Sequence, residues 1–358
     1  MSAHRALVSA LAAAAVLGTA CAKQESLGHS SVTVLGAGVV NNPANRSLRF
    51  DILKFGLSRF CQEMTRVGVP LKLADDQPVV GRFFAEGCQS QIMDDEERRA
   101  LVVQYNGRGY AWSNVTGRIG FKSAGIVEFL PDFQLHEGAM YIYFRPRKIS
   151  ANSFETTLVE SAVARGGMAV AGVDPDKRGR QVVDAQLERG FTVIRYGEDG
   201  STDFAVGLVA LGQTPFQPFR IVQSDKQSLA NERTEVHAEQ QDFVGGFEIT
   251  EDDQSLYLTM SLDGAPAVDV FLVPKPAGDQ MIAGYVTHPG PAALVGHPLL
   301  GEPLFAGKVW KRYVRAPKGS YYLVIDNTAA VGPTSPATSP GDDRAAKVDY
   351  VVQLGESP

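Results

Sequence analysis

Catalytic chemistry would need nucleophiles, acid–base groups or metal ligands in a recognisable pattern, and the sequence offers few of these. It contains six histidines and three cysteines. The histidines are scattered and none forms the closely spaced pair that is typical of a zinc site, although folding could assemble one from distant positions. The motifs GxSxG and HExxH, and the β-lactamase motif set, are absent from the sequence. The sequence therefore predicts no catalytic residue, no metal site and no cofactor, and it favours a protein that is not an enzyme.

Two of the three cysteines are placed to form a disulfide. Neither Cys61 nor Cys88 lies in a CxxC motif, which argues against a dithiol redox site. In an oxidising compartment the two would pair, and the bridge would stabilise the fold by about 3 to 4 kcal/mol through its effect on chain entropy. The alternatives are free buried thiols or a nucleophile.

Aromatic residues suggest a possible ligand contact. The segment Tyr105–Trp112 alternates aromatic residues with glycine and arginine. Exposed Tyr110 and Trp112 could stack on a sugar ring or anchor an interface. They could instead line a hydrophobic cavity for a lipid or acyl chain, together with Tyr141, Tyr143 and Phe144. The alternative is a hairpin whose aromatic side chains pack the core.

The N-terminus has the pattern of an export signal. Met1–Arg5 is short and carries a positive charge, and Ala6–Leu17 is small or apolar except for Ser9. A run of this length is too short for a permanent membrane span but suits the apolar region of a signal peptide. We expect residues 1–20 to be a signal peptide rather than a buried helix.

The residues that follow resemble the lipobox of bacterial lipoproteins. The motif is Leu17–Cys21, with small residues before the cysteine and leucine one place further away than is usual. The resemblance implies that Cys21 is acylated and anchors the protein, and that residues 21–31 are a polar tether. Because Ala22 is not acidic, it also implies an outer-membrane location. The alternative is ordinary cleavage after a small residue, which would give a periplasmic or secreted protein.

The charge balance argues against nucleic acid as a partner. The chain carries 34 lysines and arginines against 40 acidic residues, a net charge of −6. A general nucleic-acid binder normally presents a basic face to phosphate groups.

Strand-like patterns dominate residues 32–213, and two helical patterns interrupt them. The helices are expected at Asp51–Val67 and Gln181–Arg189. These patterns predict an α+β domain over residues 32–213. The expected strands are Val32–Val40, Ile119–Phe129, Met140–Phe144, Phe191–Tyr196 and Phe204–Leu211.

The second half is predicted to be an all-β sandwich. Residues 214–242 are rich in proline and polar residues and are expected to be a linker and lead-in. Short strand patterns with turn signals then fill residues 243–356, as is typical of a β-sandwich. They are Phe243–Thr250, Ser255–Leu262, Val268–Val273, Met281–Thr287, Val309–Val314, Tyr321–Ile325 and Val348–Leu354.

Two of these strands resemble the end of a known domain family. Gly319–Thr328 and Lys347–Val352 are similar to the last two strands of the Golgi-dynamics domain, although the loop between them is longer here. That family is a β-sandwich used in protein or lipid contacts, so the resemblance implies a binding role.

Together these patterns predict a non-enzymatic exported protein of the cell envelope that acts as a binding or assembly module. Its expected partners are the membrane, through a lipid anchor, and an envelope protein or hydrophobic ligand. The alternatives are a carrier of a hydrophobic ligand such as a lipid, held between the strands and the helix of the first domain, and a hydrolase with an unrecognised site.

Overall fold

The computed structural model describes residues 42–48, 50–51, 60–94, 99–113, 116–161, 174–196, 202–221, 225–336 and 345–358. The expected signal peptide, the tether, Cys21 and the expected strand Val32–Val40 lie outside these residues. No helix in the described chain is both long and apolar enough to cross a membrane.

The described chain is mostly β, with a few helices. The helices are η2 (Pro43–Asn45), α4 (Phe60–Arg66), α6 (Pro175–Glu188) and α7 (Lys275–Tyr285). The strands are β1 (Val69–Lys72), β2 (Val79–Asp94), β3 (Arg99–Ser113), β4 (Gly117–His136), β5 (Ala139–Val159), β6 (Phe191–Tyr196), β7 (Thr202–Val206), β8 (Gln227–Val236), β9 (Gln240–Ile249), β10 (Gln254–Asp263), β11 (Ala267–Pro274), β12 (Leu300–Phe305), β13 (Trp310–Arg315), β14 (Gly319–Asn327) and β15 (Ala346–Glu356).

A large mixed sheet runs through both halves of the chain. Its order is β13-β10-β15-β8-β2-β3-β4-β5-β6-β7, and β1 pairs with β2. Its strands are antiparallel except at the seam between β2 and β8, which are parallel and pair at Val79 and Thr234. This seam joins the strands of the first half to those of the second half.

A small antiparallel sheet, in the order β12-β11-β14-β9, completes the sandwich of the second half. Its inner face packs against β8, β15, β10 and β13, and the apolar side chains between the two layers are buried. This core includes Leu256, Val270, Leu323, Ile325 and Val352.

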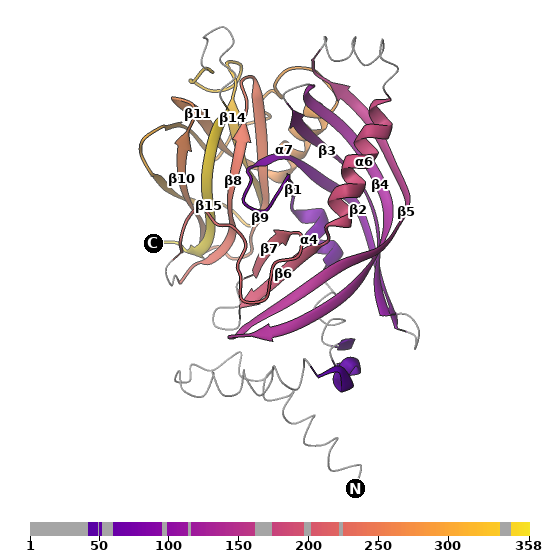
Figure 1. The fold of residues 1–358 in the computed structure, drawn as a ribbon. Coiled ribbons are helices and arrows are strands. Elements are labelled where there is room, and N and C mark those ends of the chain that lie inside the picture. Colours follow the sequence, from indigo (N-terminus) through magenta and orange to yellow (C-terminus); the bar gives the residue numbers. More distant parts are fainter. Residues whose placement is uncertain are drawn as a thin grey trace.

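The opposite face of the small sheet is also covered. Phe243, Tyr285 and Tyr322 form a buried cluster there with Phe84 of β2 and Tyr110 of β3. The large sheet therefore contacts the small sheet on both of its faces. Figure 1 shows α7 between the sandwich and the long strands β2–β5.

The helices of the first half cover the other face of the long strands. Phe60 of α4 and Leu187 of α6 pack with the buried residues Leu101, Val127 and Phe129. The predicted bridge is confirmed, because a disulfide joins Cys61 of α4 to Cys88 of β2.

Several expectations about the elements need revision. The β-rich character of the chain is confirmed, but the prediction of a strand at Met281–Thr287 is wrong, since α7 occupies most of that segment. Pro276 near its start suits the first turn of a helix, and Met281, Ile282 and Tyr285 share its buried face. Strand β8 lies within the expected linker 214–242, so that part of it belongs to the large sheet. The domain limits themselves stay a prediction.

Candidate ligand groove between the two halves

A cavity of about 470 Å³ lies where the first half meets α7. Its walls come from α4, β2, β3, α7 and β14, so neither half forms it alone. The residues that line it are Thr65, Val67, Phe84, Ala85, Glu86, Arg108, Lys275, Asp279, Gln280, Ile282, Ala283 and Tyr322. We call this cavity the α4–α7 groove.

The α4 wall is fixed at both of its ends. Near its start the disulfide ties Cys61 to β2. At its end Arg66 donates from Nη1 to the carbonyl oxygen of Gly246 at 2.7 Å. Gly246 has φ +89°, and a Cβ there would collide with the carbonyl oxygen of Arg66, so only glycine allows this close approach.

The α7 wall carries a charged pair on its exposed side. Lys275 Nζ lies 2.8 Å from Asp279 Oδ1, at the i,i+4 spacing that brings side chains together on a helix. The Tyr322 phenol donates to the same carboxylate at 3.1 Å. Burial, and after it the Asp279 charge, raises the pKa of Tyr322, so the phenol stays a neutral hydrogen-bond donor.

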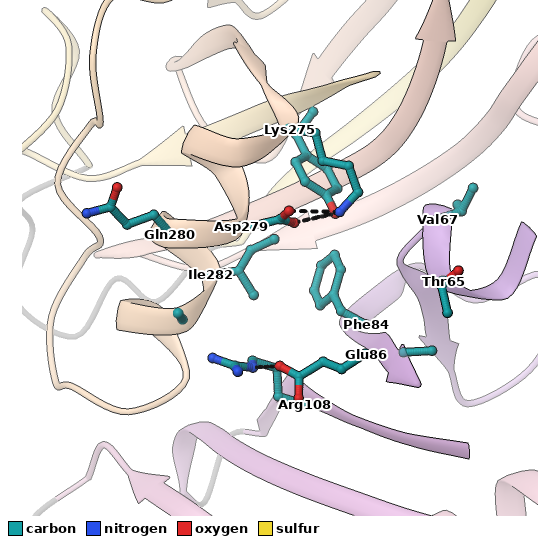
Figure 2. Close-up of a pocket in the computed structure, with 12 residues that line it drawn as sticks. Thr65, Val67, Phe84, Glu86, Arg108, Lys275, Asp279, Gln280 and Ile282 are labelled. Atoms are coloured by element: carbon teal, nitrogen blue, oxygen red, sulfur yellow. Dashed lines mark hydrogen bonds and ion pairs between the residues drawn. The ribbon is translucent and has the colours of Figure 1, made fainter. Parts of the chain in front are cut away.

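A second charged pair lies across the groove, with apolar side chains between the two. Arg108 of β3 pairs with Glu86 of β2. Figure 2 shows the Lys275–Asp279 pair at one side, the Arg108–Glu86 pair at the other, and Phe84 and Ile282 between them. The arrangement suits an amphiphile, because apolar surface would take its body and the charged pairs would take its polar ends.

The loop after α7 is held by a buried arginine. Arg118 of β4 is fully buried and donates to the carbonyl oxygens of His288 and Gly290 at 3.1 and 2.8 Å. It also pairs with Glu160 at 2.8 Å, and its guanidinium stacks on the Tyr285 ring. These contacts fix the C-terminal end of α7 against the first half.

A buried ionic cluster connects the halves close to Phe84. Arg82 of β2 is 2% exposed and donates to both carboxylate oxygens of Asp242 at 2.8 and 2.9 Å. It also donates to the Tyr350 hydroxyl at 2.9 Å. Burial alone raises the pKa of a carboxyl group, but the charge and hydrogen bonds of Arg82 outweigh it and lower the pKa of Asp242. The cluster therefore holds a full charge pair inside the protein.

The two aromatic residues proposed from sequence as ligand contacts lie outside the groove lining. Tyr110 is buried, donates to Asp242 Oδ1 at 2.6 Å and accepts from the backbone N–H of Phe243 at 2.9 Å. Trp112 is half-buried and stacks on His237. Both are packed against the second half, and their role as ligand contacts stays a prediction.

A second hollow, of about 490 Å³, lies where the sequence suggested a hydrophobic carrier site, between the strands and helix of the first half. Its lining is mostly polar or charged, from residues of β5 and α6. Tyr141 and Tyr143 lie in a separate buried cluster. The hollow is lined by Pro146, Arg147, Ile149, Asn152, Arg180, Asp184 and Glu188.

Two buried carboxylates face each other on the outer side of the small sheet. Asp269 of β11 and Asp326 of β14 are register partners and fully buried. Burial is the largest cause that raises the pKa of Asp326 to about 7, and the charge of Asp269 adds to it. Gln241 and Thr328 act in the opposite direction through their hydrogen bonds to Asp326. The Asp326 carboxyl group is thus poised to hold a proton near neutral pH.

Sequence reasoning missed the groove because its parts are far apart in the chain. One local signal was available, since Lys275 and Asp279 have helical spacing just after a strand and flank Pro276. No local sequence pattern indicates that Glu86 of β2 and Arg108 of β3 lie opposite α7. The described residues contain no group of three or more His, Cys, Asp and Glu side chains that could hold a metal ion.

No family model and no curated protein matches the chain.

Proposed function

We propose that the protein is a non-enzymatic binding protein of the cell envelope and that it takes an amphiphilic ligand in the α4–α7 groove. The observation that carries the proposal is the lining of this groove. Two charged pairs border an apolar surface in a cavity of about 470 Å³, within the size range of small-molecule sites.

The position of the groove supports binding rather than a purely structural gap. Its walls are held by a disulfide, by the Arg66–Gly246 contact and by the buried Arg118, so the cavity is largely formed before any ligand arrives. A preformed site loses less conformational entropy on binding, which favours affinity.

Features of the sequence and the disulfide support a location in the cell envelope. The Cys61–Cys88 disulfide is consistent with a compartment outside the cytoplasm, where such bonds persist. The signal-like residues 1–20 and the lipobox-like motif ending at Cys21 fit a protein that is exported and anchored through a lipid. The resemblance of Gly319–Thr328 and Lys347–Val352 to two strands of the Golgi-dynamics domain also favours a binding role.

Native mass spectrometry of the purified protein tests the proposal, with anilinonaphthalenesulfonate as an added amphiphilic probe. We expect a bound amphiphile or a saturable probe signal in the wild type. Ala283→Trp should abolish either one, because Ala283 lines the groove. The matched control is Ala185→Trp on the exposed side of α6, which should leave binding unchanged.

Two results would contradict the proposal. One is a folded Ala283→Trp protein that binds as well as the wild type. The other is a wild type that carries no amphiphile and gives no saturable probe signal. A stoichiometric protein partner in the spectrum, without an amphiphile, would favour an assembly role instead.

A further inference from the structure

A turn at the edge of the sandwich exposes apolar side chains that the fold does not use. It joins β12 of the small sheet to β13 of the large sheet, and we call residues 305–311 the β12–β13 corner. Phe305 and Val309 are each 57% exposed. Phe305 ends β12 and Val309 immediately precedes β13, so two large apolar side chains flank one short turn and are exposed to solvent. Such exposure indicates a contact surface rather than a core.

The corner is also the centre of a basic segment in an acidic protein. Residues 299–318 contain five lysines and arginines and one acidic residue, whereas the whole chain has a net charge of −6. Arg312 forms an ion pair with Glu302, with Nη2 and Oε2 2.7 Å apart. Lys308 and Lys311 are exposed and form no ion pair with any residue that the structure describes. Two positive charges are therefore available beside the exposed Phe305 and Val309.

The corner is held firmly by its two strands. Leu304 is fully buried immediately before it, and Val314 is buried in β13 after it. The backbone N–H of Ala306 donates to the carbonyl oxygen of Pro266 at 3.0 Å, and Gly307 adopts φ +78° to make the turn. The apolar and basic side chains are consequently presented on a defined turn.

We infer that the β12–β13 corner docks onto the surface of an anionic lipid bilayer. Phe305 and Val309 would enter the interfacial region, and Lys308 and Lys311 would contact lipid phosphate groups. A nucleic acid would attract the same lysines but would leave the apolar side chains in water. The rest of the chain is negatively charged, so an anionic membrane repels the other faces of the protein. This repulsion orients the molecule with the corner toward the membrane.

The inference is independent of the ligand groove and is tested with vesicles. The full chain carries Cys21→Ala in every sample, so that no acyl chain contributes. Its binding to vesicles of phosphatidylcholine is compared with binding to an equimolar mixture of phosphatidylcholine and phosphatidylglycerol. All samples share residues 1–41, and differences between variants therefore report on the corner.

The expected result is tighter binding to the anionic vesicles. Lys308→Ser with Lys311→Ser should weaken that binding roughly 30-fold, since each lysine near an anionic surface contributes about fivefold. Phe305→Ser with Val309→Ser should weaken binding to both kinds of vesicle. Matched controls are Lys122→Ser and Leu73→Ser, whose side chains are 55% and 65% exposed elsewhere, and these should bind as the parent does.

An insertion signal gives a second readout. The chain has two tryptophans, and Trp310 adjoins Val309. In a Trp112→Phe background, brominated lipids should quench Trp310 in anionic vesicles and should quench it less after the two lysines are replaced. Equal binding to both vesicle types, unchanged binding by the lysine variant, or a corner-dependent dimer without vesicle binding would each overturn the inference.

Discussion

Arg82 is the side chain on which the contact between the two halves depends most directly. Arg82→Met should lower the free energy of unfolding by about 3 to 5 kcal/mol, because Asp242 would remain buried without its counter-charge. Urea unfolding measures this loss. Adding Asp242→Asn to the variant should recover part of it, since the unpaired charge is then removed.

Arg233 provides the matched control for Arg82. It forms a similar two-point contact with Asp349, at 2.6 and 3.0 Å, but its side chain is 35% exposed. Arg233→Met should cost only about 0 to 1 kcal/mol, as expected for a pair near solvent. Equal losses at the two positions would contradict the central role of the buried pair.

Asp326 should make stability depend on pH. Its pKa is about 7 in the folded state and 3.8 ordinarily, so between these values the folded protein holds a proton that the unfolded chain has lost. The free energy of unfolding should therefore fall as pH rises from about 4 to about 7, by up to about 1.4 kcal/mol per pH unit from this group.

The pH dependence is measured by urea unfolding at several pH values. Asp326→Asn should flatten the slope, because an amide does not titrate. Asp253→Asn, a change at an exposed aspartate, is the control and should leave the slope as it is. A slope that survives Asp326→Asn would assign the effect to another group.

At the scale of elements, α4 depends on its disulfide. Replacing Cys61 and Cys88 with serine should lower the free energy of unfolding by about 3 to 4 kcal/mol, the value expected when a loop of this length is no longer closed in the unfolded chain. Urea unfolding with and without reductant measures it, and the double variant should not respond to reductant. If reductant destabilised the variant as much as the wild type, the stabilisation could not be attributed to the Cys61–Cys88 disulfide.

Element prediction from sequence succeeded where the pattern was local. Gln181–Arg189 lies largely within α6, whose N-cap is Asp174, and Cys61 and Cys88 pair as expected. It failed at Met281–Thr287, where β-branched and aromatic residues suggested a strand but burial against Tyr322 and Phe243 selects a helix. The sequence could not predict the groove or the Arg82–Asp242 pair. Both bring together residues 160 or more positions apart, and no local pattern encodes such contacts.

At the scale of the whole molecule, the two halves should unfold together. They share the large sheet, and Phe84 and Tyr110 of the first half are buried with Phe243 and Tyr285 of the second. Trp112 lies in β3 and Trp310 in β13, so each half contains one of the two tryptophans. The Trp310→Phe variant therefore reports on the first half through Trp112, and the Trp112→Phe variant reports on the second half through Trp310. In each variant, the urea midpoint from tryptophan fluorescence should equal the urea midpoint from circular dichroism. Two separate midpoints in either variant would show that the halves unfold independently.

Arg82 precedes Asp242 by 160 residues, so a chain synthesised from its N-terminus exposes this guanidinium long before its partner exists. In that interval the charge lies two residues from Phe84, on a strand face that will later be buried. A charge beside an exposed apolar strand opposes association with other chains, as gatekeeper residues do. The arginine that holds the finished halves together should thus also oppose aggregation of the unfinished first half.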